Sequence, residues 1–316
     1  MTNKEVYQAL CAKNPAAIPV FFQSWWLDAV CKDEWDAVIS RKGEQVSGCW
    51  PYRINKRIGI SFLRNPKLTP YTGPLVLFPQ DMKESNCDSY EYEVTEELLK
   101  SLPEADVWGL SLLPGFRQAG VFKRFSLNIG VQQTFLLNVQ KEDTDLFQQM
   151  KESIRRNIRA AEKEIIIASE PEAIHELFEF QKQTLSEKSV GQAYTEDEMK
   201  RLLEACLAHA SGEILTARQD GIIQAVIWNV WDASTSYYFM GAKNSKAENY
   251  RAMSALLWHC IKKAKARGNK NFDFEGSMDE GVERFFRGFG GRRELYLVLR
   301  RDDHLLWKII RGLGIR

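Results

Sequence analysis

The sequence predicts an α/β (α+β) chain of two domains, and three observations lead to this fold class. The chain has 316 residues, about twice the length of an ordinary domain. Its hydrophobic fraction of 44% and charged fraction of 27% are typical of a globular protein. Strand patterns that end at Gly or Pro turns also alternate with helical patterns of three- and four-residue spacing.

The first half is expected to be rich in strands after two short helices. Helical patterns cover residues 5–13 and 24–31, and the second begins at Ser24. Strand patterns follow at residues 35–40, 45–54, 58–63, 105–113 and 133–139. We predict turns at Lys42–Gly43 and Asn55–Lys56, a loop that leads into a strand over 68–78, and a helix in the second half of 81–102.

The second half is expected to begin with a strong helix over 144–164, for which Thr144 is a credible N-cap. Further helices are predicted at 171–185, 195–210 and 250–268, and strands at 212–243, 271–276 and 293–301. The dipeptide Asp220–Gly221 predicts a hairpin between the first two strands of 212–243. We place the boundary so that residues 1–132 and 133–316 form the two domains.

Composition argues against several classes of protein. The formal net charge is +1, so contact with nucleic acid would depend on local basic patches. The start has no secretory pattern, no apolar run reaches the roughly 18 residues of a membrane span, and the six cysteines are scattered without a C-x-x-C pair. We therefore expect a cytoplasmic protein. The four histidines show no metal-ligand spacing, so we expect no metal.

The most informative stretch is NFDFEGSMDEGVERFFRGFGG, residues 271–291. In a strand, Asp273 and Glu275 would share one face, opposite the phenylalanines between them. Gly276 permits a sharp exit, and the pair Ser277 and Glu280 matches a capping box, so a helix should follow at once. Two carboxylates at the end of a strand, beside a helix N-terminus, indicate a ligand site. Ion pairing that only holds the fold together is the alternative.

Four segments resemble the Fem family, the aminoacyltransferases of peptidoglycan bridges, and its FemAB-like relatives. They are SWWLDAV, LTPYTGP, IRRNIRAAEK and the FDFEG to FGG stretch. The order of elements in the second half resembles the GNAT acyltransferase fold. The resemblance implies two tandem GNAT-like domains, each a mixed, mostly antiparallel sheet flanked by helices, with the active site in 133–316. It also implies transfer of an acyl or aminoacyl group to an amine of a cell-envelope precursor or an amino sugar.

On this reading, Glu275 is the first choice for the proton acceptor and Asp273 the second, because the attacking amine must lose a proton. Backbone N–H groups of a splayed strand over 235–243 would stabilise the oxyanion. Tyr238 and Tyr296 are candidate proton donors to the leaving group, and a buried core position is the alternative for either.

The expected donor is a co-substrate, acyl-CoA or an aminoacyl-tRNA, and no tightly bound cofactor is expected. The stretch KNSKAENYRAMSALL would hold a donor pyrophosphate in the GNAT fold, but it contains no glycine. Lys243, Lys246 and Arg251 are its candidate phosphate ligands, and Glu248 opposes them. A tRNA-borne donor does not require this cradle.

For the acceptor, Arg156, Arg159 and Arg287 could hold phosphates of a nucleotide-linked or lipid-linked precursor. A solvated helix face is the alternative. Tyr194, in a loop over 189–198, and Tyr71, in LTPYTGP, are further candidate substrate contacts. Phe286 stands where the family often has lysine.

Two readings compete with the envelope-directed transferase. One is an acyl-CoA-dependent GNAT acetyltransferase for a small amine, and the other is a non-catalytic binding module that keeps the fold. The basic, tryptophan-bearing tail over 302–316 could contact a membrane surface as a peripheral element or dock on the domain core.

Overall fold

The computed structural model describes residues 1–247, 251–276, 278–302, 304 and 307. Contacts group the chain into two compact units. The first contains Met1–Pro15, Phe21–Gln132 and the described residues from Leu295, and the second contains Ala16–Val20 and Gln133–Glu294. The division into 1–132 and 133–316 stays a prediction, but the last strand groups with the first unit from Leu295 onward.

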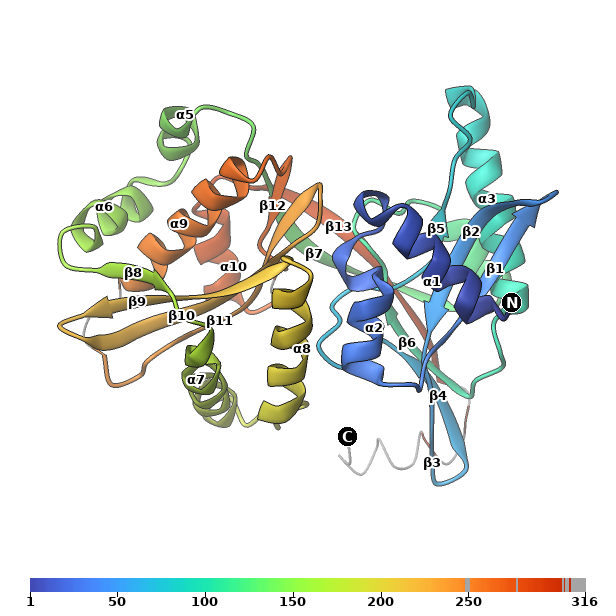
Figure 1. The fold of residues 1–316 in the computed structure, drawn as a ribbon, viewed down its shortest axis with the longest axis horizontal. Coiled ribbons are helices and arrows are strands. Elements are labelled where there is room, and N and C mark those ends of the chain that lie inside the picture. Colours follow the sequence, from blue (N-terminus) through green and yellow to red (C-terminus); the bar gives the residue numbers. More distant parts are fainter. Residues whose placement is uncertain (248–250, 277, 303, 305–306, 308–316) are drawn as a thin grey trace. The chain divides into compact units, whose positions relative to one another are not determined.

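The first unit combines a small sheet, part of a larger sheet, and four helices (Figure 1). The helices are α1 (Asn3–Lys13), α2 (Ser24–Cys31), α3 (Glu84–Ser101) and α4 (Ala119–Arg124). Between α1 and α2 lie the 3-10 turns η1 (Pro15–Ala17) and η2 (Val20–Phe22), and residues 16–20 of this connection group with the second unit. The small sheet has the order β1-β2-β5, from β1 (Asp36–Lys42), β2 (Gln45–Tyr52) and β5 (Leu75–Val76). Strands β3 (Ile54–Arg57), β4 (Ile60–Arg64) and β6 (Val107–Ser111) belong to the larger sheet.

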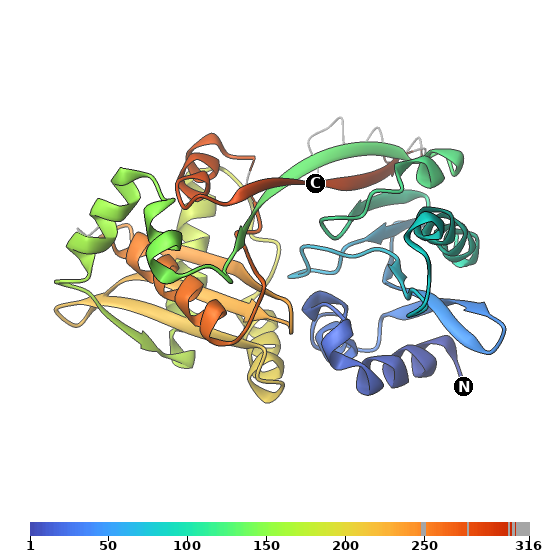
Figure 2. The same cartoon turned by 90° about the horizontal axis from the view of Figure 1, so that it is seen from above.

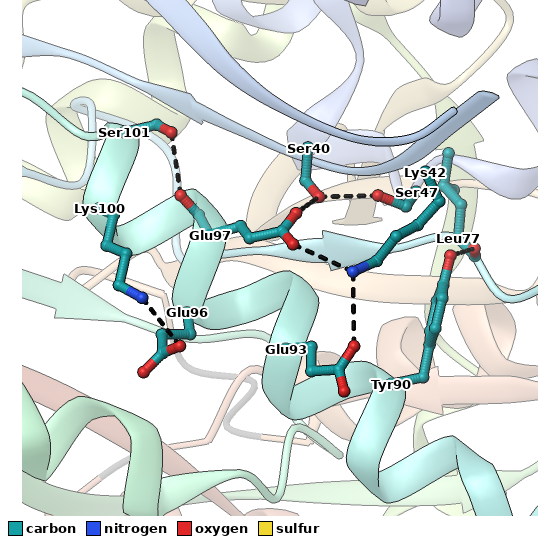
Figure 3. A network of polar contacts seen from close by, with 10 residues as sticks. All are labelled: Ser40, Lys42, Ser47, Leu77, Tyr90, Glu93, Glu96, Glu97, Lys100 and Ser101. Carbon is teal, nitrogen blue, oxygen red and sulfur yellow. Dashed lines mark hydrogen bonds and ion pairs between the residues drawn. The ribbon is translucent and has the colours of Figure 1, made fainter. Parts of the chain in front are cut away.

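Helix α3 is held to the small sheet by close packing and by a polar network. Figure 3 shows Glu97 of α3 accepting hydrogen bonds from Ser40 (2.6 Å) and Lys42 (3.0 Å) of β1. Ser40 also bonds Ser47 of β2 at 2.7 Å. These bonds lower the pKa of Glu97, with the Ser40 bond as the largest cause. The network therefore joins one helix to two strands.

The predicted turn at Asn55–Lys56 is wrong. Both residues lie in β3, which pairs with β4, and the turn falls at Ile58–Gly59. Both turn residues have positive φ, 51° and 76°, as a two-residue hairpin loop requires. This register places Ile60 in the core, whereas a turn three residues earlier would have changed the pairing of both strands.

The second unit is a sheet covered on both faces. Its strand order is β7-β12-β11-β10-β9-β8, and only β11 and β12 pair in parallel. The strands are β7 (Asn128–Asn138), β8 (Ile166–Ser169), β9 (Gly212–Gln219), β10 (Ile222–Trp231), β11 (Thr235–Lys243) and β12 (Asn271–Asp273). The prediction of a mixed, mostly antiparallel sheet flanked by helices is thus confirmed. The predicted hairpin at Asp220–Gly221 is also confirmed, with positive φ at both residues.

Helices α7 and α8 cover one face of this sheet, and α6 and α9 lie over the other (Figure 1). The helices and turn are α5 (Asp143–Gln148), α6 (Glu152–Ala161), η3 (Pro171–Ala173), α7 (Ile174–Glu187), α8 (Glu196–Ala208), α9 (Ala252–Ala266) and α10 (Glu280–Arg287). The last strand, β13 (Arg292–Asp302), lies beside β7 (Figure 2).

The predicted helix over 144–164 is two helices, α5 and α6. The chain leaves the helical path because the Lys151 N–H donates to the Gly288 carbonyl at 2.8 Å. Thr144 lies inside α5, whose N-cap is Glu142. Strand β8 was not predicted. Ser277 lies outside the described residues, and the Asp279 side chain caps α10 instead.

Candidate active site

The site begins where two parallel strands separate. Strand β12 pairs with β11 only at Thr235, Ser236 and Tyr237. Beyond this point β11 continues to Lys243, while the chain after β12 stays with β7 through the Phe274 N–H. Among the described residues, no strand pairs with the second half of β11 on this side. We call this gap between strands the β11–β12 opening.

Glu275 stands at the end of β12, where the backbone turns sharply. It has φ +53°, in the left-handed region that non-glycine residues rarely adopt. Gly276 follows with φ +58°, and a Cβ there would lie 2.0 Å from the Gln133 carbonyl oxygen, so the turn requires glycine. Strain of this kind persists where surrounding structure holds it, and it often marks a functional site.

The Glu275 carboxyl has the electrostatics of a functional acid or base. Its Oε1 atom is shielded from solvent and has no hydrogen-bond partner among the described residues. Burial raises the pKa of Glu275 well above its ordinary value, and the nearby charge of Asp273 raises it further. Such a carboxyl is a strong proton acceptor once ionised.

Asp273 holds the turn in place. It is 2% exposed, and its Oδ1 accepts hydrogen bonds from the Thr134 hydroxyl of β7 and from the Glu275 N–H at 2.8 Å. Phe272 and Phe274 lie in the core on the other side, as the alternation predicted. Asp273 is therefore tied to the scaffold, whereas the Glu275 carboxyl is not.

The other side of the opening contains Tyr238 and Gly241 of β11. The register between β10 and β11 shifts between Trp228 and Asn229, and this bulge brings Tyr238 and Gly241 to the same face of β11. A Cβ at Gly241 would lie 2.0 Å from the Tyr238 hydroxyl. Burial raises the pKa of Tyr238, and Cys260 and Glu275 add to this shift. Tyr238 is thus close enough to Glu275 to respond to its charge.

The backbone of Gly241 points into the β11–β12 opening. The Asn244 N–H donates to the Gln224 carbonyl of β10. Backbone groups alternate in an antiparallel pair, so those of Gly241, three residues earlier, point away from β10. The Gly241 carbonyl instead accepts a 2.8 Å hydrogen bond from the Gln181 amide of α7. The Gly241 N–H is therefore a candidate oxyanion donor.

Aromatic rings line the site. The Phe286 ring of α10 is 3% exposed and lies 5.3 Å from the Tyr238 ring and 5.5 Å from the Phe274 ring. Phe286, which stands where the Fem family often has lysine, therefore places an apolar ring in the wall of the site. This low-polarity surrounding is consistent with the raised pKa of Glu275.

Tyr194 lies near the same strand. Its hydroxyl is 3.5 Å from the Met240 sulfur of β11, and burial raises the pKa of Tyr194 to about 12. The loop before it starts at Lys188, which forms a 2.7 Å ion pair with Asp279.

The candidate donor ligands lie where β11 ends and α9 begins. Lys243 and Lys246 are exposed, and Arg251 immediately precedes α9. Glu248 lies outside the described residues. A helix N-terminus beside basic side chains suits an anionic ligand.

The candidate acceptor arginines do not come together around Glu275. Arg156 and Arg159 lie on the exposed face of α6, where Arg159 is 3.7 Å from Glu152 and lies over the Phe147 ring. Arg287 of α10 is 3.7 Å from Glu283. These contacts fit the solvated-face alternative at least as well as a phosphate site.

Tyr71 and Tyr296 belong to the first unit. Their rings pack 5.3 Å apart, and the Tyr296 hydroxyl donates to Gln132 at 2.8 Å. Tyr71 is 1% exposed and is a core residue of that unit, whereas Tyr296 is partly buried. Most of the predicted tail lies outside the described residues, but Trp307 packs on Phe62 with ring centres 5.0 Å apart.

Sequence reasoning missed Thr134 and Gln181. Both are neutral residues whose roles depend on pairing between distant elements. Only the position of Thr134 within an apolar strand pattern could have drawn attention to it.

Two further searches concern the described residues alone. They contain no group of three or more His, Cys, Asp or Glu side chains that could hold a metal ion. None of the helices in this part of the chain has both the length and the apolar character needed to cross a membrane.

Comparison with known proteins bears on the fold. Residues 148–287 match the family described as acetyltransferase (GNAT) domain. No curated protein matches the chain. The crystal structure of FemX superposes with a TM-score of 0.67 at 14% identity and covers 98% of both chains.

Two other solved structures match at lower similarity. L-PGS from Bacillus licheniformis gives a TM-score of 0.55 at 11% identity, over 98% of this chain and 96% of that one. A tandem GNAT protein from the clavulanic acid biosynthesis pathway gives 0.53 at 8% identity, over 89% and 88%. The resemblance to the GNAT superfamily is thus confirmed: residues 148–287 match the GNAT acetyltransferase domain model, and the whole chain has the fold of FemX and of tandem GNAT proteins.

Proposed function

We propose that the protein is an acyltransferase that moves an acyl or aminoacyl group from an activated ester or thioester to an amine. The observation that carries this proposal is the unpartnered, shielded carboxyl oxygen of Glu275 at the β11–β12 opening. A binding module would gain nothing from a strained backbone that holds an acid there, whereas amine attack needs a proton acceptor.

The proposed reaction has three parts. The amine nitrogen attacks the carbonyl carbon while Glu275 accepts a proton from the nitrogen. The Gly241 N–H stabilises the oxyanion. The bond from carbon to the leaving oxygen or sulfur then breaks, Tyr238 gives that atom a proton, and protonated Glu275 restores the proton on Tyr238. The net result is one new amide bond and one proton moved from the amine to the leaving group.

The acceptor that we propose is an amine of a cell-envelope precursor or an amino sugar. The resemblance to the Fem family and the fold shared with FemX support it. The donor is either acyl-CoA or aminoacyl-tRNA. The exposed Lys243 and Lys246 before α9 support a donor with phosphates, a feature that both donors share.

The test is a transfer assay with the full chain, using acetyl-CoA and alanyl-tRNA separately as donors and mass spectrometry of an amine acceptor. We expect Glu275→Gln to lower the transfer rate at least about 100-fold, the usual contribution of a general base. Glu280→Gln, an exposed change on the following helix, is the matched control and should keep the rate. Unchanged transfer by Glu275→Gln would remove Glu275 from the mechanism.

A further inference from the structure

The loop between α7 and α8 contacts both the segment that follows β12 and strand β11. At its start, Lys188 pairs with Asp279, which follows β12 and caps α10. At its end, the Tyr194 hydroxyl contacts Met240 of β11. Residues 189–193 therefore lie between a contact to the segment that follows β12 and a contact to β11.

The inner side of this loop is defined by alternating burial. Gly191, Ala193 and Thr195 are exposed, whereas Gln192 and Tyr194 are partly buried. Gln192 and Tyr194 are therefore the residues of this stretch that face the protein, and Tyr194 contacts β11.

The Gln192 amide has no structural use among the described residues. Its Oε1 and Nε2 atoms are both shielded from solvent, and neither has a hydrogen-bond partner there. A buried polar group without a partner destabilises a protein, so natural proteins seldom keep one without a function. The neighbouring charge of Lys188 is already compensated by Asp279.

We infer that Gln192 is a specificity-determining residue that binds a peptide-like amide group of the acyl acceptor. Its Nε2 would donate to the amide carbonyl and its Oε1 would accept from the amide N–H. A neutral amide suits this position better than phosphate or carboxylate, because a primary amide offers both a donor and an acceptor but no charge. The inference rests on the proposed function in taking the opening as the transfer site.

The first experiment measures thermal stability of the full chain without ligand. Gln192→Leu removes both polar atoms at similar size, and Gln183→Leu, an exposed change on α7, is the matched control. We expect the Tm of Gln192→Leu to equal that of the wild type or exceed it by about 2–4 °C. A Tm that falls by more than that of the control would show that the amide serves the fold, and would overturn the inference.

The second experiment measures binding by NMR, with N-methylacetamide as the minimal peptide group and methyl acetate as a probe that lacks the N–H. The ¹⁵N side-chain amide signals that disappear in Gln192→Leu identify Gln192. We expect these signals to move at least several-fold further with N-methylacetamide than with methyl acetate. Equal movement, or none, would overturn the inference.

This binding measurement needs no turnover, so the two proposals can fail separately. If Glu275→Gln keeps full transfer but the Gln192 signals respond as expected, only the catalytic role of Glu275 is lost. If transfer depends on Glu275 but the Gln192 signals do not respond, only the acceptor contact is lost.

Discussion

Glu275→Gln should make the protein progressively more stable than the wild type as the pH rises. The native pKa of Glu275 is raised by burial and by Asp273, so the folded protein keeps a proton that the unfolded chain loses near pH 4.3. A group with a raised native pKa stabilises the fold fully below the unfolded pKa, and this stability is lost as the pH rises through the native pKa. Glutamine has no such dependence.

The magnitude follows from proton linkage. Between the two pKa values, the wild type binds up to one more proton when folded, so its free energy of unfolding falls by up to about 1.4 kcal/mol per pH unit relative to the variant. The Oε1 atom of Glu275 has no hydrogen-bond partner among the described residues, so its replacement in Glu275→Gln breaks no bond that would offset this gain in stability.

The assay is urea unfolding of both proteins at several values between about pH 5 and pH 7, with linear extrapolation to water. Glu280→Gln, on the exposed face of α10, controls for the loss of one carboxylate. The reasoning would be refuted if the two stability curves ran parallel, or if the deficit of the Gln variant grew with pH.

Three other substitutions test the geometry around the site and the fold. Gly241→Ala should cost about 1–3 kcal/mol and lower transfer, because the new methyl group would lie 2.0 Å from the Tyr238 hydroxyl; an unchanged urea midpoint would contradict this. Gly276→Ala should be destabilising by a similar amount, since a Cβ there meets a backbone carbonyl at 2.0 Å and the residue has positive φ; equal Tm values would argue against the turn. Glu170→Gln should cost about 1 kcal/mol near neutral pH, because the pKa of Glu170 is lowered by Thr216 and Arg218. That difference should disappear as the pH falls through the lowered pKa, and a constant difference in urea unfolding would contradict it.

The sequence predicted the elements around the site better than their junctions. Alternation placed Phe274 in the core and drew attention to Asp273 and Glu275. It did not predict that Glu275 leaves the strand with a positive φ, because that turn depends on a contact between Gly276 and a carbonyl of β7. The sequence pattern therefore identified Asp273 and Glu275. Tertiary packing decides that Asp273 is hydrogen-bonded to the scaffold while Glu275 Oε1 has no partner among the described residues.

The break between α5 and α6 has a similar cause. Helical spacing continues through Met150 and Ile154, and both are buried as the pattern predicts. The Lys151 N–H nevertheless donates to the Gly288 carbonyl, 137 residues later in the chain (288 − 151). No local signal in the sequence could therefore show the break. Gln181 and Gln192 were missed for the same reason. Gln181 bonds Gly241 of β11, and Gln192 lies in the loop that contacts β11 through Tyr194, so both positions depend on a strand that is distant in the sequence.

The most direct test of the central claim is the pH dependence of transfer to a lysine side-chain amine, with wild type and Glu275→Gln compared at each pH. If Glu275 removes the proton of the amine, the wild type should be faster by at least about 100-fold near neutral pH. Glutamine cannot accept the proton that the nitrogen loses during attack, so this advantage should persist up to the amine pKa of about 10.4, where the free amine is abundant for both proteins. A ratio near one at neutral pH, or a ratio that falls to one as the amine loses its first proton to water, would contradict the account.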